Sequence, residues 1–169
     1  MMDAEQDVVI VAGVRTPFVK AWTAFERVHP VELGRIVARE AVERAGIDPG
    51  EIDEVVVGNI AGPADAANIG RVIALEAKLP QRVPAYTVNR NCASGIQRIV
   101  DAAYRIRCGD ADVTVAVSVE SMSRIPFLFS DAAQRLWIRA GRARGVLGKA
   151  AAFARMRPRH FAPVPALKL

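Results

Sequence analysis

The sequence predicts an α/β protein in which helices cover both faces of a mostly parallel sheet, a three-layer α/β/α arrangement. Short apolar segments rich in β-branched residues alternate with longer segments whose apolar residues repeat at helical spacing, in the order βαβαβαβ. One helix separates each pair of successive strands, which is the connection that parallel strands require. With 169 residues and 51% hydrophobic composition, the chain is long enough to bury a core of this kind.

The first predicted strand is Val8–Ala12, a run of five apolar residues that is too short for a helix and too uniform for a half-exposed strand. We therefore expect it to be buried. A helix should follow from Pro30, which suits a first helical position, and should end at Gly46. A turn at 48–50 then leads into a second buried strand at 55–58. The apolar face of the helix is expected to carry Leu33, Ile36, Val37 and Ala41.

The alternation of helix and strand repeats twice more along the chain. The residue pattern predicts a helix over 68–79 and a β-branched strand over 84–88. A longer helix ending at Gly109 and a fourth strand over 113–119 complete the series. The buried face of the longer helix is expected to consist of Ile96, Ile99, Val100 and Ala103.

Charge divides the chain near Ser123. Residues 1–123 carry 13 Lys and Arg against 17 Asp and Glu, whereas residues 124–169 carry 10 Lys and Arg against Asp131 alone. We therefore predict an α/β domain over 1–123 and a basic, helical region over 124–169. Apolar residues, including Trp137, lie among the arginines of this region, so an anionic membrane surface and the phosphates of a ligand are both candidate partners. No nucleic-acid motif accompanies the basic residues, and we expect no nucleic-acid partner.

The two cysteines, Cys92 and Cys108, are too few for a disulfide-stabilised scaffold. No Cys or His cluster has metal-ligand spacing, so we expect no metal site. The first residues are acidic where a signal peptide is basic, and the apolar runs are shorter than a membrane span. These features predict a cytoplasmic protein.

Cys92 is the candidate catalytic nucleophile. It lies between the strand at 84–88 and the long helix, and parallel sheets bind ligands beyond the carboxyl ends of their strands. A helix N-terminus favours an anion and thus a thiolate, and the small residues at 93–95 leave room for a substrate carbonyl. Position alone also allows a buried structural cysteine. Cys108 lies at the opposite end of the helix, where a thiolate is disfavoured, and is expected to have an inert packing role.

Four segments, in order along the chain, resemble the thiolases, a family of acetyl-CoA acyltransferases. Residues 88–97, Val-Asn-Arg-Asn-Cys-Ala-Ser-Gly-Ile-Gln, are similar to the family's acyl-enzyme nucleophile segment. Residues 9–18 resemble its opening strand, 57–59 its second strand and 119–123 the end of its fourth strand. The basic region is similar to the start of the loop domain in thiolases of the fatty-acid β-oxidation complex.

Two positions depart from the thiolase pattern. Arg98 stands where the nucleophile helix of the family usually has a small residue. Val117 and Ser118 stand where a glycine pair is expected before Val119. The long cation at Arg98 is expected to point outward or to extend along the surface, and the bulk at Val117 to tighten the space near the site.

The resemblance implies that Cys92 takes an acyl group from a coenzyme A thioester, in thiolytic cleavage or Claisen condensation of 3-ketoacyl-CoA. Coenzyme A thioesters are then substrates, with no permanently bound cofactor. The resemblance also implies an N-terminal fragment. The family's activating His, second Cys and oxyanion groups belong to a C-terminal half, and its sheet is closed by a segment that returns after the loop domain. Neither His29, at a helix start, nor His160, in an Arg-rich run, is expected to replace that base.

An alternative function is a non-catalytic half-thiolase that acts as a dimerising or CoA-binding module. A ketoacyl synthase is disfavoured by the segments around Cys92 and Glu120. The resemblance implies a homodimer or higher oligomer, with 85–88 in the dimer contact, and allows a partner in a β-oxidation complex. The residues that contact coenzyme A are not identified by the sequence.

Overall fold

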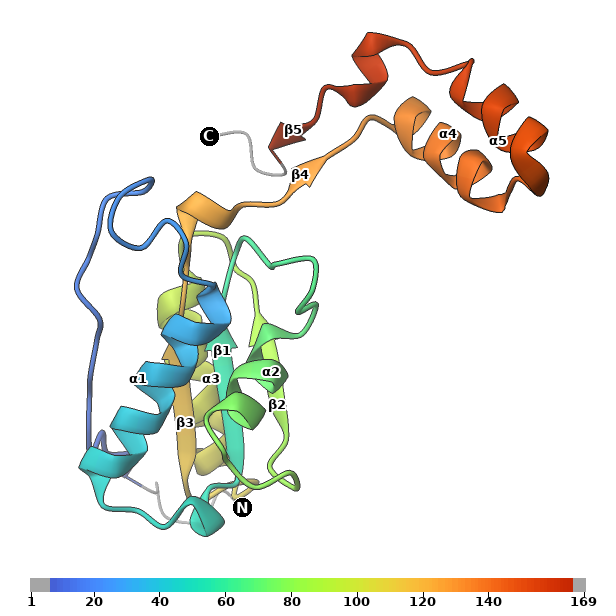
Figure 1. The fold of residues 1–169 in the computed structure, drawn as a ribbon. Helices are drawn as coiled ribbons and strands as arrows, with labels where there is room; N and C mark the ends of the chain where they lie inside the picture. The colour runs from blue at the N-terminus through green and yellow to red at the C-terminus, as the bar shows by residue number, and fades with distance from the viewer. Residues whose placement is uncertain (1–6, 166–169) are drawn as a thin grey trace. The chain divides into compact units, whose positions relative to one another are not determined.

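The structure is a computed structural model that describes residues 7–165 (Figure 1). The chain forms two units, Met1–Arg124 and Ile125–Leu169. The first unit contains a parallel sheet with its helices, and the second contains helices and a short antiparallel strand pair. The units are described separately below.

The sheet of the first unit consists of β1 (Glu54–Gly58), β2 (Ala85–Val88) and β3 (Thr114–Ser118), in the order β2-β1-β3. Both pairings are parallel, which confirms the predicted parallel α/β fold. The central strand β1 is buried on both faces, and Val55, Val56 and Val57 are fully buried. This burial explains why the middle of β1, residues 55–57, is uniformly apolar rather than alternating.

Helices cover both faces of the sheet. α1 (Pro30–Ala45) and α2 (Ile69–Glu76) pack against each other on one face, and α3 (Ser94–Arg107) lies on the other (Figure 1). A short 3-10 turn at Pro49–Glu51 connects α1 to β1, and another at Met122–Arg124 follows β3. The residues buried most completely between α1, α2 and the sheet include Ala38, Ile52, Ile69, Ile73 and Val83.

The ends of α1 confirm the predicted start and stop. The backbone N–H of Val31 donates to His29 Nδ1 at 3.2 Å, and Pro30 occupies the first helical position. Gly46 ends the helix with φ of 66°, a left-handed conformation that glycine adopts without strain.

The predicted buried face of α1 was partly wrong, because Ile36 is 45% exposed. The fully buried positions of α1 are Pro30, Gly34, Ala38 and Val42.

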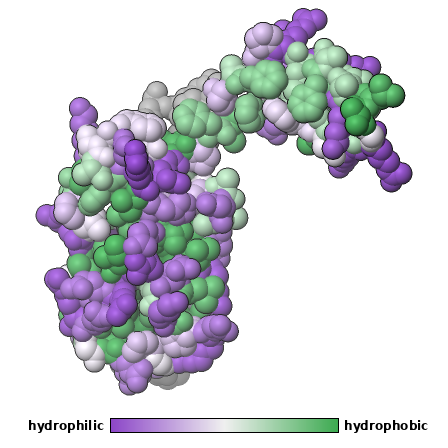
Figure 2. Space-filling view, viewed as in Figure 1, coloured by the Kyte–Doolittle hydropathy of each residue, from purple (hydrophilic) through white to green (hydrophobic). Residues whose placement is uncertain are grey.

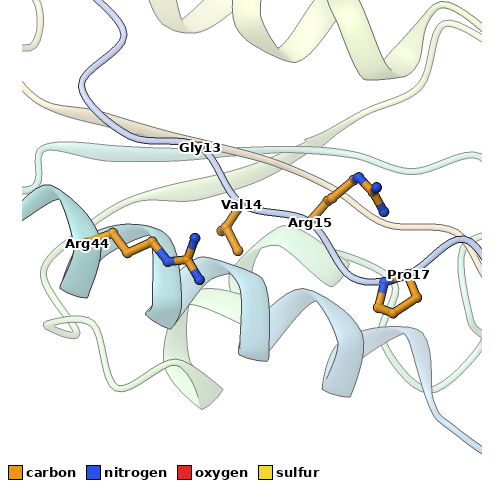
Figure 3. Close-up of a pocket in the computed structure, with 5 residues that line it drawn as sticks. All are labelled: Gly13, Val14, Arg15, Pro17 and Arg44. Carbon is orange, nitrogen blue, oxygen red and sulfur yellow. The ribbon is translucent and has the colours of Figure 1, made fainter.

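The predicted strand at Val8–Ala12 is not formed. The segment has no regular secondary structure, and Val9, Ile10 and Val11 are 71%, 80% and 66% exposed. A groove of about 900 Å³ lies between the segment and β3, so its backbone lacks the paired edge that stabilises a strand. Further along, a second depression of about 650 Å³ is lined by Gly13, Val14, Arg15, Pro17 and Arg44 of α1 (Figure 3).

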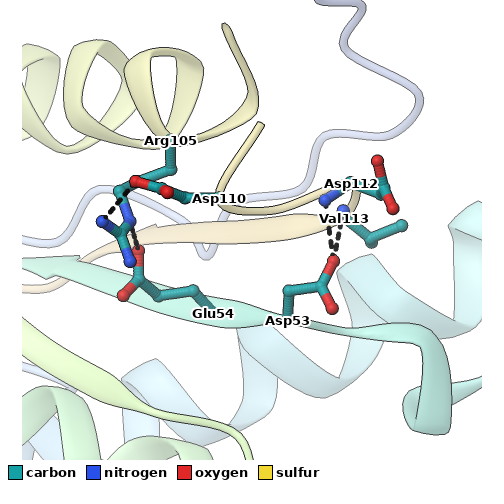
Figure 4. Close-up of polar contacts among 6 residues, drawn as sticks. All are labelled: Asp53, Glu54, Arg105, Asp110, Asp112 and Val113. Atoms are coloured by element: carbon teal, nitrogen blue, oxygen red, sulfur yellow. Dashed lines mark hydrogen bonds and ion pairs between the residues drawn. The ribbon is translucent and has the colours of Figure 1, made fainter. Parts of the chain in front are cut away.

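Polar contacts fix the amino-terminal ends of β1 and β3 (Figure 4). Asp53 Oδ2 accepts hydrogen bonds from the N–H groups of Asp112 at 2.8 Å and Val113 at 2.9 Å. These two bonds lower the pKa of the Asp53 carboxyl from its ordinary value, the bond from Val113 most strongly. Arg105, near the end of α3, donates to Glu54 at 2.9 Å and to Asp110 at 2.9 Å. The two strands and α3 are therefore joined at this end of the sheet.

The second unit pairs β4 (Phe127–Leu128) with β5 (Val164–Pro165) in antiparallel orientation. Between these strands lie α4 (Asp131–Arg142), α5 (Gly145–Phe153) and a 3-10 turn at Pro158–Phe161. The Trp137 ring contacts the rings of Phe129, Phe153 and Phe161, with centroids 6.4, 6.0 and 5.8 Å away. Hydrophobic and basic residues both lie on the surface of this unit (Figure 2). Among residues 7–165, no helix combines the length and apolar composition that a bilayer crossing requires.

Candidate active site

Cys92 lies in the turn that connects β2 to α3, at the carboxyl end of the parallel sheet. Its side chain is exposed, so the alternative of a buried structural cysteine is wrong. The preceding residue, Asn91, has φ of 49°. Asparagine tolerates this left-handed conformation better than most residues do, and the conformation turns the chain sharply between strand and helix. The turn therefore presents the thiol to solvent two residues before α3 begins.

Ser94, the first residue of α3, holds this turn in place. Its buried hydroxyl accepts a hydrogen bond from the N–H of Arg90 at 2.7 Å and donates one to the carbonyl of Asn91 at 2.7 Å. The N–H of Asn91 donates to Asn89 Oδ1 at 3.0 Å. These bonds fix the backbone on both sides of the Cys92 thiol. The sequence predicted Ser94 only as a small residue, although serine at a helix start is also a recognised capping signal.

Gly58, at the end of β1, permits the close approach of this turn to the sheet. A Cβ atom added at Gly58 would lie 2.5 Å from the carbonyl oxygen of Ser94. Any larger residue at this position would push the start of α3 away from β1. The segment at 57–59 that resembles the thiolases therefore contributes to the placement of Cys92.

Glu120 joins the loops that follow β1 and β3. Its carboxylate accepts hydrogen bonds from the N–H groups of Ile60 at 2.8 Å and Ala61 at 3.0 Å, and from Asn59 Nδ2 at 3.3 Å. Asn59 Nδ2 also donates to the carbonyl of Val119 at 2.8 Å. The buried Asn59 Oδ1 has no hydrogen-bond partner among the described residues. Sequence reasoning missed this pair, although polar residues directly after buried strands are a signal for such a site.

Each histidine is engaged by other residues of its own unit, so neither ring is free to act on the Cys92 thiol. His29 Nδ1 accepts from Val31, and His29 Nε2 lies 3.3 Å from Asp65 Oδ1. This confirms the expectation that His29 serves the helix start. His160, in the second unit, is buried, and its Nδ1 accepts from the N–H of Arg157 at 3.0 Å. Both rings therefore support local backbone structure.

The two departures from the thiolase pattern lie near each other. Arg98 does not point outward, because one guanidinium nitrogen donates to the carbonyl of Ala116 in β3 at 3.2 Å. Burial lowers the pKa of the Arg98 guanidinium from its ordinary value. Val117 is buried, and Ser118 Oγ donates to the carbonyl of Gly58 at 3.3 Å.

Cys108 differs from its expected packing role. It caps the C-terminal end of α3, and its side chain is exposed rather than buried. Within residues 7–165, no group of three or more His, Cys, Asp or Glu side chains is arranged to hold a metal ion. The candidate chemistry of the first unit is thus that of an exposed thiol on a rigid turn.

Comparison with known proteins agrees with this arrangement. The family model for the thiolase N-terminal domain matches residues 8–161. The 3-ketoacyl-CoA thiolase of Yersinia pestis (strain Pestoides F) is 38% identical over 157 residues, which are 93% of this chain and 36% of that protein. The acetyl-CoA acetyltransferase of Bacillus anthracis superposes with a TM-score of 0.71 at 43% identity, covering 73% of this chain and 32% of the other. A thiolase of Ascaris suum in complex with coenzyme A gives 0.70 at 30% identity, covering 72% and 32%.

The fold and the site define a class of protein: parallel α/β domains that carry a cysteine on a turn between a strand and a helix. The chain belongs to the thiolase family, of which it carries the N-terminal domain. It spans 36% of the length of the curated relatives that it matches.

Proposed function

We propose that this chain supplies the nucleophile of a thiolase-type acyltransferase, with Cys92 forming the acyl-enzyme. The observation that carries this proposal is the exposed Cys92 on a turn fixed by Ser94. The Cys92 thiolate attacks the carbonyl carbon of a CoA thioester, the carbonyl–sulfur bond to CoA breaks, and CoA leaves as a thiolate that takes up a proton. The acyl group then remains on Cys92 Sγ as a new thioester.

The names of the relatives support 3-ketoacyl-CoA and acetyl-CoA thioesters as the substrate class. The coenzyme A complex of the Ascaris suum thiolase supports coenzyme A as a ligand of this chain. We propose that the unit Ile125–Leu169 is the start of a loop domain whose arginines contact CoA phosphates or a partner protein. We place contact of its basic and apolar surface with an anionic membrane below contact with CoA phosphates or a partner protein. The proposed location is the cytoplasm.

Complete turnover needs groups beyond this chain. A thiolase cycle requires a base for the α-carbon of the second acyl-CoA and a proton donor for the leaving group. His29 and His160 are both engaged in local hydrogen bonds or ion pairs. We propose that the missing groups come from the part of the thiolase length that this chain does not span, in thiolytic cleavage or Claisen condensation.

Acyl transfer to Cys92 can be tested without turnover. The full chain is incubated with acetyl-CoA, and the product is examined by intact mass and peptide mapping. We expect one acetyl group on Cys92, retained in Cys108→Ala and absent from Cys92→Ala. A folded protein that acquires no acetyl group, or that acquires it on Cys108, would contradict the proposal.

The second candidate function is a CoA-binding or dimerising module without catalysis. The engagement of both histidines favours it, because neither imidazole is then available to activate the thiol. Calorimetric titration with CoA separates the two functions. Binding of CoA by a chain that never becomes acylated would support the module.

A further inference from the structure

Hydrogen bonds join three loops at the carboxyl edge of the sheet. The loop 59–61 follows β1, residues 89–93 follow β2, and Glu120 lies in the loop after β3. The three strands are parallel, so all three loops leave the sheet at the same edge (Figure 1). A residue in one loop can therefore affect the placement of Cys92 in another without touching the thiol.

Asn89 connects the loop after β1 to the turn that carries Cys92. Its Nδ2 donates to the carbonyl of Ile60 at 3.3 Å, and its Oδ1 accepts from the N–H of Asn91 at 3.0 Å. The reverse amide orientation would set an acceptor against the carbonyl and a donor against the N–H. The Asn89 side chain is exposed, so these two bonds rather than packing orient it. One carboxamide thus links Ile60 to the residue that precedes the thiol.

Glu120 holds the peptide group to which Asn89 is bonded. Its carboxylate accepts from the N–H of Ile60 at 2.8 Å and from the N–H of Ala61 at 3.0 Å. The Ala61 N–H and the Ile60 carbonyl belong to one trans peptide group and point in opposite directions. Glu120 therefore bonds to one side of this peptide and Asn89 to the other. A carboxylate on the N–H also strengthens the carbonyl of the same peptide as an acceptor.

The buried side chain of Asn59 shows that this arrangement has a cost in stability. Asn59 is 3% exposed, and its Nδ2 donates to Val119 and Glu120. Its Oδ1 is buried and has no hydrogen-bond partner among the described residues. A buried acceptor without a donor is unfavourable, and departures of this kind are expected at functional sites more than elsewhere. Placement of the loop therefore explains the Asn59–Glu120 pair better than stability does.

We propose that Glu120 is a positioning residue for Cys92. Its carboxylate fixes the peptide at 60–61, and that peptide orients Asn89. Asn89 in turn holds the N–H of Asn91 and so sets the direction of the Cys92 thiol. Glu120 acts through this series of bonds rather than on the substrate. The inference rests on the proposed function, in which Cys92 attacks a thioester carbonyl along a defined direction.

Hydrogen exchange measured by NMR tests the series of bonds without acyl transfer. Glu120→Gln keeps the size of the side chain but sets an NH2 group against one of the N–H donors at 60–61. We expect the amide of Asn91 to exchange about tenfold faster in this variant, the factor expected for the loss of one hydrogen bond to a charged group. Glu120→Asp, which keeps the charge but is shorter, replaces Glu120→Gln if that variant does not fold, with the same expectation.

Asn68→Ala is the matched control. The exposed Asn68 also bridges two segments, because its Nδ2 donates to the carbonyl of Ala85 at 3.0 Å and its Oδ1 accepts from the N–H of Arg71 at 3.2 Å. It caps α2 and is not bonded to the Cys92 turn. The control should therefore lose a similar number of hydrogen bonds and leave exchange at Asn91 unchanged.

Single turnovers with acetyl-CoA measure the effect on the thiol. Glu120→Gln and Asn89→Ala should each lower the limiting rate of Cys92 acetylation by roughly 10- to 100-fold, because a small misplacement of a reacting group has an effect of this size. The acetyl-CoA concentration that gives half the limiting rate should stay unchanged. Alkylation by iodoacetamide at about pH 10, where free thiols are largely ionised, should also stay unchanged, since a small reagent reaches an exposed thiolate from many directions.

The double variant of Glu120 and Asn89 separates positioning from independent structural effects. Both residues act through the same peptide, so the double variant should acetylate no more slowly than the slower single variant. Rates that multiply in the double variant would overturn the proposal. So would unchanged exchange at Asn91 in Glu120→Gln, or a loss of acetylation no larger than in Asn68→Ala.

Failure of the proposed function would look different. Wild-type chain that acquires no acetyl group would contradict acyl transfer to Cys92. Exchange at Asn91 would then still decide whether Glu120 fixes the turn that carries the thiol: faster exchange in the Glu120 variant supports the positioning role, and unchanged exchange overturns it.

Discussion

Cys92 and Cys108 lie at opposite ends of α3, and both side chains are exposed. Access to solvent therefore does not distinguish the two thiols. Any difference in their reactivity must come from their electrostatic surroundings. Cys92 lies two residues before the start of the helix, at the positive end of its dipole, whereas Cys108 caps the C-terminal end. The dipole of a helix favours an anion near its N-terminus and disfavours one near its C-terminus.

Selective alkylation tests this difference. Near neutral pH, a limiting amount of iodoacetamide should modify Cys92 several-fold faster than Cys108, because the thiolate is the reacting species. Peptide mapping by mass spectrometry measures the ratio, and Cys92→Ala provides the reference rate for Cys108. Equal labelling of the two cysteines would contradict the prediction.

Replacing Ser94 by alanine should loosen the turn around the thiol. The change removes one acceptor from the Arg90 N–H and one donor from the Asn91 carbonyl, at a cost of about 1–3 kcal/mol of unfolding free energy. Urea unfolding measures that cost, and the rate of Cys92 acetylation should fall as well. Ser118→Ala is the control, since the exposed Ser118 makes one longer bond, at 3.3 Å. An effect of Ser94→Ala no larger than that of Ser118→Ala would count against the role of Ser94.

At the scale of elements, a carboxylate at each end of the sheet forms hydrogen bonds that join two of the segments flanking its strands. Asp53 binds the backbone that leads into β3, and Glu120 binds the backbone that leaves β1. Each carboxylate accepts two main-chain N–H groups. At Asp53 these bonds favour the charged form of the carboxyl and lower its pKa, so they link the stability of the sheet to pH.

Asp53 should contribute stability that depends on its charge. Because its folded pKa lies below the ordinary value of about 3.9, the contribution is complete above that value and is lost as the pH falls through the folded pKa. Asp53→Asn should therefore lower the unfolding free energy near about pH 7, and the difference from wild type should shrink below about pH 4. Urea unfolding across this range measures it, with the exposed Asp112→Asn as control. A difference that stays constant with pH would refute the prediction.

At the scale of the whole molecule, we propose that the chain supplies the nucleophile of a thiolase cycle and that the other catalytic groups come from the part of the thiolase length that it does not span. The chain spans 36% of its curated relatives, and one edge of its sheet borders an open groove. Apolar surface and unpaired strand edges of this kind promote association. Activity and assembly are thus expected to depend on a complementing polypeptide.

Purified chain should show no steady-state thiolysis of acetoacetyl-CoA with CoA. Acetyl transfer from acetyl-CoA to Cys92 is expected, but cleavage of the carbon–carbon bond of acetoacetyl-CoA needs a proton donor for the departing α-carbon, which no described group supplies. A continuous assay of acetoacetyl-CoA consumption measures this, with Cys92→Ala setting the background rate. Turnover well above that background would show that a residue of this chain replaces the missing base.

The sequence by itself determined the features that depend on neighbouring residues. Apolar spacing and caps placed α1, β1, β2 and β3, and the helix start placed Cys92, because periodicity and unpaired backbone groups are local properties. Tertiary structure decided what depends on distant segments. Val8–Ala12 has the composition of a strand but lacks a partner edge, and Asn59 meets Glu120 only after the sheet brings their loops together. Arg98 likewise turned inward, because the free edge of β3 offers it a carbonyl that no local pattern could indicate.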